Sequence, residues 1–185
     1  MLKEVKERNI FFSKQVDQET IEAVTKSIVE INESDEIIAK QAEINGFTYH
    51  PKPIKIYIDS YGGQVYACWG LLGVMGSSKT PIHTIVTGCA MSCGFMILIS
   101  GHKRFGYKLS TPLYHQISGG TSGNIPDMEN NLKQSKRLQK ELENITLSKT
   151  KMTKEQLKKI YKEKIDFYMT AKQALKFGVI DEIIE

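Results

Sequence analysis

One serine lies among small residues in the segment Gly88-Cys89-Ala90-Met91-Ser92-Cys93-Gly94. An apolar run at residues 82–87 predicts a buried strand, residues 88–92 predict a turn, and a helix is expected from about residue 93. A serine at the start of a helix can serve as a nucleophile, because the free N–H groups of the first turn stabilise a developing oxyanion. The nearest donor is the Cys93 N–H. An ordinary tight turn explains the same residues, since Ala90 breaks the G-x-S-x-G pattern of esterases.

Two adjacent glycines, Gly62 and Gly63, follow the predicted strand at residues 54–58. Glycines at the end of a strand can present backbone N–H groups to a ligand where a side chain would block its approach. The alternative is a tight turn without a ligand. The residues alone leave both interpretations open.

A serine nucleophile needs a general base and a group that orients the base. His115 lies in the apolar-rich segment 113–117, where it is either a satisfied core side chain or a positioned base. The other histidines are expected at the surface or in structural positions: His50, His83 and His102. Asp166 is a lone carboxylate between apolar residues. It is either the orienting acid or an aspartate at a helix end or on the surface.

Strands and helices alternate along the whole chain. Strands are predicted at residues 9–12, 54–58, 82–87, 104–109, 112–117 and 179–184. Helices are predicted after an N-cap at Asp17, at residues 64–76, from about residue 93, at residues 127–147, and after capping boxes that begin at Thr153 and Thr170. Residues 34–53 are ambiguous, partly helical and then broken by glycine and proline. The alternation predicts an α/β fold with much parallel pairing.

The composition is that of one soluble globular domain. The chain has 185 residues, 41% of them hydrophobic and 25% charged, which excludes a disordered or collagen-like protein. Three cysteines and a charged N-terminus without an apolar core predict reduced thiols, no signal peptide and a cytoplasmic location. Residues 80–102 lack charge, but polar residues and glycines interrupt them, so no membrane span is expected.

The net charge of +4 is too small to imply nucleic-acid binding. The positive charge is concentrated in residues 128–164, which contain 11 Lys or Arg against 5 Asp or Glu. No aromatic residues are interleaved along the predicted helix at 127–147, as base stacking would require. We therefore interpret this segment as a solvated helix face and expect no nucleic-acid partner.

Five segments, taken in order, resemble the ClpP family, the proteolytic subunits of the Clp proteases. The segments are Asp59-Ser60-Tyr61-Gly62-Gly63, residues 88–94, Tyr114-His115-Gln116, the turn Gly119-Gly120-x-x-Gly123, and residues 166–181. The resemblance extends from about residue 5 to residue 184. It implies one domain over residues 1–185 with the ClpP/crotonase-like fold, which consists of repeated β-β-α units and a protruding handle helix, here at about residues 119–150.

The resemblance also implies a role for each candidate residue. Ser92 matches the nucleophile, His115 the base and Asp166 the orienting acid. Gly63 and Cys93 match the residues whose N–H groups form the oxyanion hole, and the substrate-binding positions are Gly62, Gly63 and Gln116. The thiols of Cys89 and Cys93 flank the serine and are an alternative nucleophile. We interpret them as small buried side chains.

The activity implied is that of a serine endopeptidase that hydrolyses unfolded proteins or peptides inside a chamber of stacked heptameric rings, a homo-oligomer without metal or cofactor. Two alternatives remain at this stage. One is a dedicated phage protease that processes a structural protein, and the other is a catalytically idle assembly subunit with the same fold.

Three features depart from the family pattern. The segment that forms the axial loops is not found before the first strand, which argues against regulated docking to an AAA+ unfoldase. Residues 35–51 are additional sequence, expected to form a surface elaboration. Asp59 and Tyr61 flank Ser60 where the family usually has Ser-Pro before the two glycines, and Tyr61 is expected to reshape the substrate site.

Overall fold

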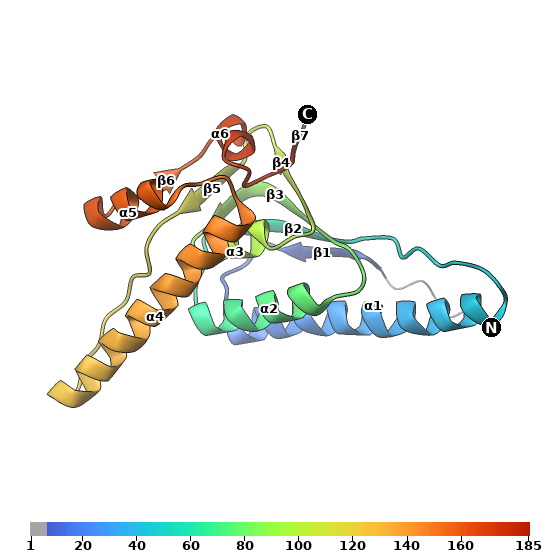
Figure 1. Cartoon of the computed structure of the whole chain (residues 1–185), viewed down its shortest axis with the longest axis horizontal. Coiled ribbons are helices and arrows are strands. Elements are labelled where there is room, and N and C mark those ends of the chain that lie inside the picture. The colour runs from blue at the N-terminus through green and yellow to red at the C-terminus, as the bar shows by residue number, and fades with distance from the viewer. Residues whose placement is uncertain (1–6) are drawn as a thin grey trace.

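The computed structural model describes residues 7–185, and its centre is one seven-stranded sheet (Figure 1). The strands are β1 (Asn9–Phe12), β2 (Ile54–Ser60), β3 (Ile82–Met91), β4 (Lys103–Tyr107), β5 (Thr111–Tyr114), β6 (Phe167–Tyr168) and β7 (Glu182–Ile184). The helices are α1 (Gln18–Ile44), α2 (Val65–Ser77), α3 (Cys93–Ile99), α4 (Ile125–Lys149), α5 (Lys154–Glu163) and α6 (Ala171–Lys176). Neighbouring strands in the order β1-β2-β3-β4-β7 are all parallel, which confirms the predicted α/β class.

Strand β3 is the point where the sheet divides. Its first half pairs with β4, from His83 opposite Lys103 to Val86 opposite Gly106. Its last three residues pair instead with β5, which in turn pairs with β6 in the antiparallel direction. The fork leaves β5 and β6 beside the end of β3. The residues that follow these strands therefore come together at one place.

The core is formed by the apolar faces of α1 and α2 and by the central strands. In β2 the residues Ile54, Ile56 and Ile58 are fully buried and alternate with more exposed residues, as the sequence pattern predicts. Every residue of α3 is buried. Each large apolar side chain buried in this way contributes about 2 kcal/mol to folding. The helix that follows Ser92 is therefore held rigidly in the centre of the molecule.

Helix α1 is longer than the sequence pattern indicates. Its N-terminus is the predicted one, because Asp17 caps the helix in a capping box with Thr20. Residues 34–44, which the sequence left ambiguous, continue the same helix to Ile44. Part of the additional sequence therefore extends α1, and Asp35 is buried inside it. The carboxylate of Asp35 accepts hydrogen bonds from Arg8, Tyr49 and Thr80. These bonds connect α1 to the segments that precede β1, β2 and β3.

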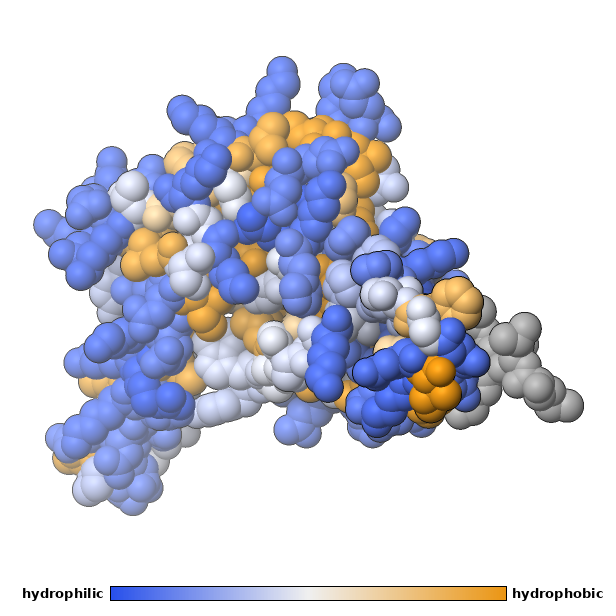
Figure 2. Space-filling model, turned by 45° about the vertical axis from the view of Figure 1, so that its right-hand side comes forward, coloured by the Kyte–Doolittle hydropathy of each residue, from blue (hydrophilic) through white to orange (hydrophobic). Residues whose placement is uncertain are grey.

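Helix α4 projects from the body of the molecule (Figure 1). Asn124 caps its N-terminus by accepting a hydrogen bond from the Asp127 N–H, and Pro126 follows in the first turn. Its buried residues all lie in the second half of the helix: Leu138, Gln139, Leu142 and Thr146. The projecting first half is covered mainly by hydrophilic side chains, which form the lower-left arm of the surface in Figure 2.

Two predicted boundaries near the site were wrong, and one strand was missed. Strand β3 continues to Met91, so residues 88–91 are strand and the expected turn is reduced to Ser92. Strand β5 ends at Tyr114, so His115 lies just after the strand and not inside it. The short strand β6 at Phe167–Tyr168 was not predicted, because two residues are too few to produce a pattern.

None of the helices in the described part of the chain combines the length and the apolar character that a membrane crossing needs. The expectations about a signal peptide and about the axial-loop segment concern the N-terminus. Residues 1–6 lie outside the described residues.

Candidate active site

Ser92 occupies the sharp turn between β3 and α3. Its backbone angles are φ 53° and ψ −119°, and it is one of two non-glycine residues with positive φ among residues 7–185. Such a conformation costs about 1–3 kcal/mol and is found preferentially at functional sites. The buried strand and helix on either side impose this conformation. The turn exposes the hydroxyl to a cleft and starts a helix directly behind it.

The turn that contains Gly62 and Gly63 packs against this serine. A Cβ atom built on Gly62 would lie 2.6 Å from the Met91 carbonyl oxygen and 2.7 Å from the Ser92 Cβ. Gly62 has φ +96° and Gly63 has φ +150°, both in the region that favours glycine. Only glycine permits this close approach. Both glycines are therefore required by the geometry at this turn.

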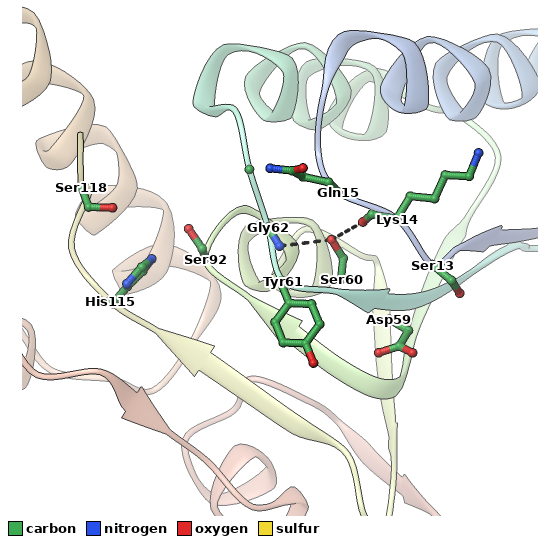
Figure 3. Close-up of a pocket in the computed structure, with 11 residues that line it drawn as sticks. Ser13, Lys14, Gln15, Asp59, Ser60, Tyr61, Gly62, Ser92, His115 and Ser118 are labelled. Atoms are coloured by element: carbon green, nitrogen blue, oxygen red, sulfur yellow. Dashed lines mark hydrogen bonds between the residues drawn. The ribbon is translucent and has the colours of Figure 1, made fainter. Parts of the chain in front are cut away.

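The glycine turn is also joined to the chain that precedes α1. The Val16 N–H donates to the Gly62 carbonyl oxygen at 2.8 Å, and the Gln64 N–H donates to the Val16 carbonyl oxygen at 2.7 Å. The Ser60 hydroxyl donates to the Lys14 carbonyl oxygen at 2.6 Å and accepts from the Gly62 N–H at 3.2 Å (Figure 3). Hydrogen bonds therefore fix the chain both before and after the two glycines.

The antiparallel pair β5–β6 places His115 opposite Asp166. Leu113 pairs with Tyr168 and Tyr114 with Phe167, so the next residues in the same register are His115 and Asp166. The His115 Nδ1 lies 3.2 Å from the Asp166 Oδ1. This contact fits a carboxylate that fixes the imidazole tautomer with Nδ1 protonated and leaves Nε2 free to accept a proton.

The strand that carries His115 is held against the serine turn. The Ser92 N–H donates to the Leu113 carbonyl oxygen at 3.2 Å, and Met91 pairs with Leu113 in the sheet. The Tyr114 ring packs edge-on against Phe95 of α3 with centroids 5.6 Å apart. The end of β5 is therefore fixed relative to both the turn and the helix that follows it.

Ser92 and His115 line a common cleft of about 730 Å³ (Figure 3). The residues that line it are Ser13, Lys14, Gln15, Asp59, Ser60, Tyr61, Gly62, Gly63, Ser92, His115 and Ser118. A second hollow of about 60 Å³ adjoins the same serine and histidine, and both polar and apolar residues line it. It is lined by Gly63, Val65, Trp69, Ser92, Cys93, Met96, His115, Gln116, Ile117, Ser118 and Leu142.

The two hollows share Gly63, Ser92, His115 and Ser118, so they adjoin at the serine and the histidine. Asp166 is absent from both linings and reaches the site through His115. Gln116, predicted to contact substrate, lines the smaller hollow, and its buried Oε1 has no hydrogen-bond partner within residues 7–185. Tyr61 lies at the rim of the larger cleft with 80% of its surface exposed.

The thiols near the serine are held in other contacts. The Cys93 Sγ donates to the Gly63 carbonyl oxygen at 3.2 Å, and the hydrogen bond from Cys68 lowers the pKa of Cys93. Burial raises the pKa of the Cys89 thiol to about 11, with a contribution from Asp59, so Cys89 is protonated at neutral pH. All three cysteines are buried and unpaired by disulfides. The Ser92 hydroxyl lines the larger cleft together with His115, whereas the Cys93 thiol lines only the smaller hollow and donates to a backbone carbonyl.

No group of three or more His, Cys, Asp or Glu side chains within the described ranges has the arrangement of a metal site. The Ser92 hydroxyl and the His115 imidazole line the cleft, and the Asp166 carboxylate contacts the imidazole from outside it. Backbone N–H groups lie at the two turns. This combination can transfer an acyl group through a serine.

A family model for the Clp protease matches residues 1–185 of this chain. The chain belongs to the Clp protease family. Membership of this family indicates a serine-type peptidase of the ClpP type, and it confirms the resemblance noted in the sequence and the fold class.

Named relatives in three organisms agree with this assignment. An ATP-dependent Clp protease proteolytic subunit of Porphyromonas gingivalis is 32% identical over 181 residues, which cover 97% of this chain and 74% of the relative. A protein of the same name from Streptococcus mutans is 37% identical over 162 residues, covering 85% and 81%. One from Deinococcus radiodurans is 35% identical over 136 residues, covering 71% and 65%.

Sequence patterns did not identify some of the residues that line the cleft of this Clp family member. Ser13, Lys14 and Gln15 approach the site from the segment before α1, far from Ser92 in sequence, and no motif marks them. The sequence patterns mark Ser60 only as a neighbour of the two glycines. Its place beside the glycines is the one signal that could have identified its hydroxyl as a support for the turn.

Proposed function

We propose that Ser92, His115 and Asp166 form the catalytic triad of this Clp family peptidase. His115 removes the proton from the Ser92 hydroxyl, and Ser92 attacks a peptide carbonyl. Asp166 holds the imidazole in the tautomer that accepts this proton and stabilises the imidazolium that results. The observation that carries the proposal is the β5–β6 register, because it aligns His115 with Asp166 at the edge of the cleft that contains Ser92.

The oxyanion is bound by the N–H groups of Gly63 and Cys93. The Ser92 N–H is occupied by Leu113 and the Gly62 N–H by Ser60, which leaves the next residue in each turn to face the reacting carbonyl. Each such donor is worth about 3–4 kcal/mol in the transition state. Gly62, Gly63 and Gln116 contact the substrate, an unfolded polypeptide or peptide that lies along the larger cleft.

The chain acts as a homo-oligomer of stacked heptameric rings, with the serines inside a chamber in the cytoplasm. The whole chain forms one domain, and α4 with its flanking turn is the handle that joins two rings. The projection of α4 from the body supports this role. We include no cofactor, metal, nucleic acid or membrane in the proposed function, and regulated docking to an AAA+ unfoldase is not part of it.

The family assignment favours the general peptidase over the two alternatives, a phage processing protease and an idle assembly subunit. The intact geometry of the site also argues against idleness, because the strained serine, both glycines and the His115–Asp166 contact are all present. An idle subunit has no need to keep these features together.

The experiment that tests the proposal compares wild type with Ser92→Ala as assembled particles. Wild type should cleave a fluorogenic peptide with an apolar residue before the scissile bond, and Ser92→Ala should show no cleavage above background. The mass of both particles in solution should be that of a multimer. Equal cleavage by the two proteins, or no cleavage by an assembled wild type, would overturn the proposal.

A further inference from the structure

Beyond Tyr114, the chain that carries His115 leaves the sheet without regular secondary structure until α4 begins. One contact fixes it soon after the histidine. The Ile117 N–H donates to the Oε1 of Gln139 on α4 at 2.9 Å. Because the end of β5 is also fixed at Tyr114, His115 and Gln116 span the short distance between two anchors.

Gln139 is suited to be a rigid anchor. Only 8% of its surface is exposed, although glutamine is usually a surface residue. Its Nε2 donates to the Oε1 of Glu143 one turn along the helix at 2.8 Å. This second contact fixes which end of the amide faces Ile117. Leu138 and Leu142 are buried on either side, so the helix itself is firmly packed at this point.

We propose that Gln139 is a positioning residue, whose side-chain carbonyl holds the Ile117 N–H and thereby fixes the His115 imidazole relative to Ser92. The inference rests on the proposed function, since it assigns a part to Gln139 only if His115 acts as the base. Gln139 lines neither the cleft nor the smaller hollow, so it acts through the backbone and not by contact with substrate.

Loss of this anchor should affect the chemical step more than substrate binding. Without the acceptor, the partly buried Ile117 N–H takes another partner and the segment from His115 shifts. A displacement of about 1 Å in a catalytic group can reduce the rate about a hundredfold. The larger cleft is formed largely by the glycine turn and the segment before α1, which the change leaves in place. Gln116 shifts together with His115, but it is only one of the proposed substrate contacts, so KM should change by no more than about twofold.

The test measures kcat and KM for a fluorogenic peptide on the assembled full chain, together with the rate at which a fluorophosphonate labels Ser92. Gln139→Met keeps the length of the side chain and removes the acceptor. We expect kcat and the labelling rate to fall tenfold or more together, with KM within about twofold of wild type.

A paired variant tests the rescue. Gln139→Glu combined with Glu143→Gln keeps an acceptor for Ile117 and exchanges amide and carboxylate between the two positions, so both hydrogen bonds can form. It should recover kcat to within about threefold of wild type. Gln134→Met is the matched control on the same helix, because Gln134 contacts Tyr66 and not the His115 segment. It should leave kcat unchanged.

Wild-type kcat in assembled Gln139→Met, or failure of the paired variant to recover, would overturn the inference. If Gln139→Met does not assemble, Gln139→Asn replaces it, since this variant keeps a buried amide but is too short to reach Ile117. Wild-type kcat in that variant would equally overturn the inference. Absence of cleavage and of Ser92 labelling in wild type is a different result, which contradicts the proposed function itself.

Discussion

His115 and Asp166 face each other directly beyond the last pair of an antiparallel ladder, with Nδ1 of the imidazole 3.2 Å from Oδ1 of the carboxylate. The two residues are far apart in sequence and lie at the ends of two very short strands. The alignment comes from the backbone, because the pairs Leu113–Tyr168 and Tyr114–Phe167 set the register independently of these two side chains. The two-residue strand β6 therefore sets the position of Asp166 relative to His115.

Asp166→Asn should reduce kcat by about two to four orders of magnitude and change KM little. The amide can donate to Nδ1 and so favour the wrong imidazole tautomer, and it cannot stabilise the imidazolium. The measurement is steady-state peptide cleavage by the assembled particle. Asp127→Asn, an exposed aspartate in the first turn of α4, is a control that should keep wild-type kcat. A wild-type kcat in Asp166→Asn would remove Asp166 from the triad.

Gly62→Ala should abolish peptide cleavage and destabilise the fold by about 2 kcal/mol or more. The new Cβ would lie 2.6 Å from the Met91 carbonyl oxygen, and φ +96° is strained for alanine. Gly70→Ala is the matched control, because Gly70 lies inside α2 with open space around its Cα. That change should raise stability by up to about 1 kcal/mol. Thermal unfolding and cleavage rates measure both effects, and an active Gly62→Ala would contradict the packing of the two turns.

Cys93→Ala should keep cleavage within about fivefold of wild type, whereas Ser92→Ala loses it. The role proposed for Cys93 belongs to its backbone N–H, which the substitution retains, while the thiol donates to the Gly63 carbonyl oxygen. The measurement is the same peptide assay. Cleavage that persists in Ser92→Ala and disappears in Cys93→Ala would identify a thiol nucleophile instead.

Asp35→Asn should lower stability at neutral pH by about 2 kcal/mol, because the charged hydrogen bonds to Arg8 are weakened. Burial alone would raise the pKa of Asp35, but hydrogen bonds from Arg8, Thr80 and Tyr49 hold that pKa below its usual value of 3.8. The stabilisation is therefore present above about pH 4 and is lost as the pH falls through the lower folded-state pKa.

The gap in unfolding free energy between wild type and Asp35→Asn should thus be largest at neutral pH and close under acid conditions. Denaturant unfolding at several pH values measures it. Glu22→Gln, an exposed change on the same helix, should show no gap at any pH. A gap that widens as the pH falls would contradict the sign of the pKa shift.

The sequence predicted the features that depend on local pattern. The strand at Asn9–Phe12, the Asp17 cap, the buried face of α1 and the boxes at Thr153 and Thr170 are all confirmed, because caps and periodicity act over a few residues. The family resemblance is confirmed by the match over the whole chain.

The features that depend on long-range contacts were missed. Strand β3 continues through Gly88 because β5 pairs with its last residues, a contact that no local pattern records. Residues 34–44 continue the helix, and Asp35 among them accepts hydrogen bonds from Arg8 and Thr80, which lie far away in sequence. The support given by Gln139 to the His115 segment is of the same kind. The resemblance assigned roles to the candidate residues, but only the three-dimensional structure relates their positions.

The central claim is that Ser92 is a nucleophile activated by His115. The most direct measurement is the intact mass of the assembled protein after exposure to a fluorophosphonate, with the adduct located by peptide mapping. The account predicts one adduct per chain, at Ser92, and a strongly slowed reaction in His115→Ala. An assembled wild type that remains unmodified, or an adduct at another residue, would contradict it.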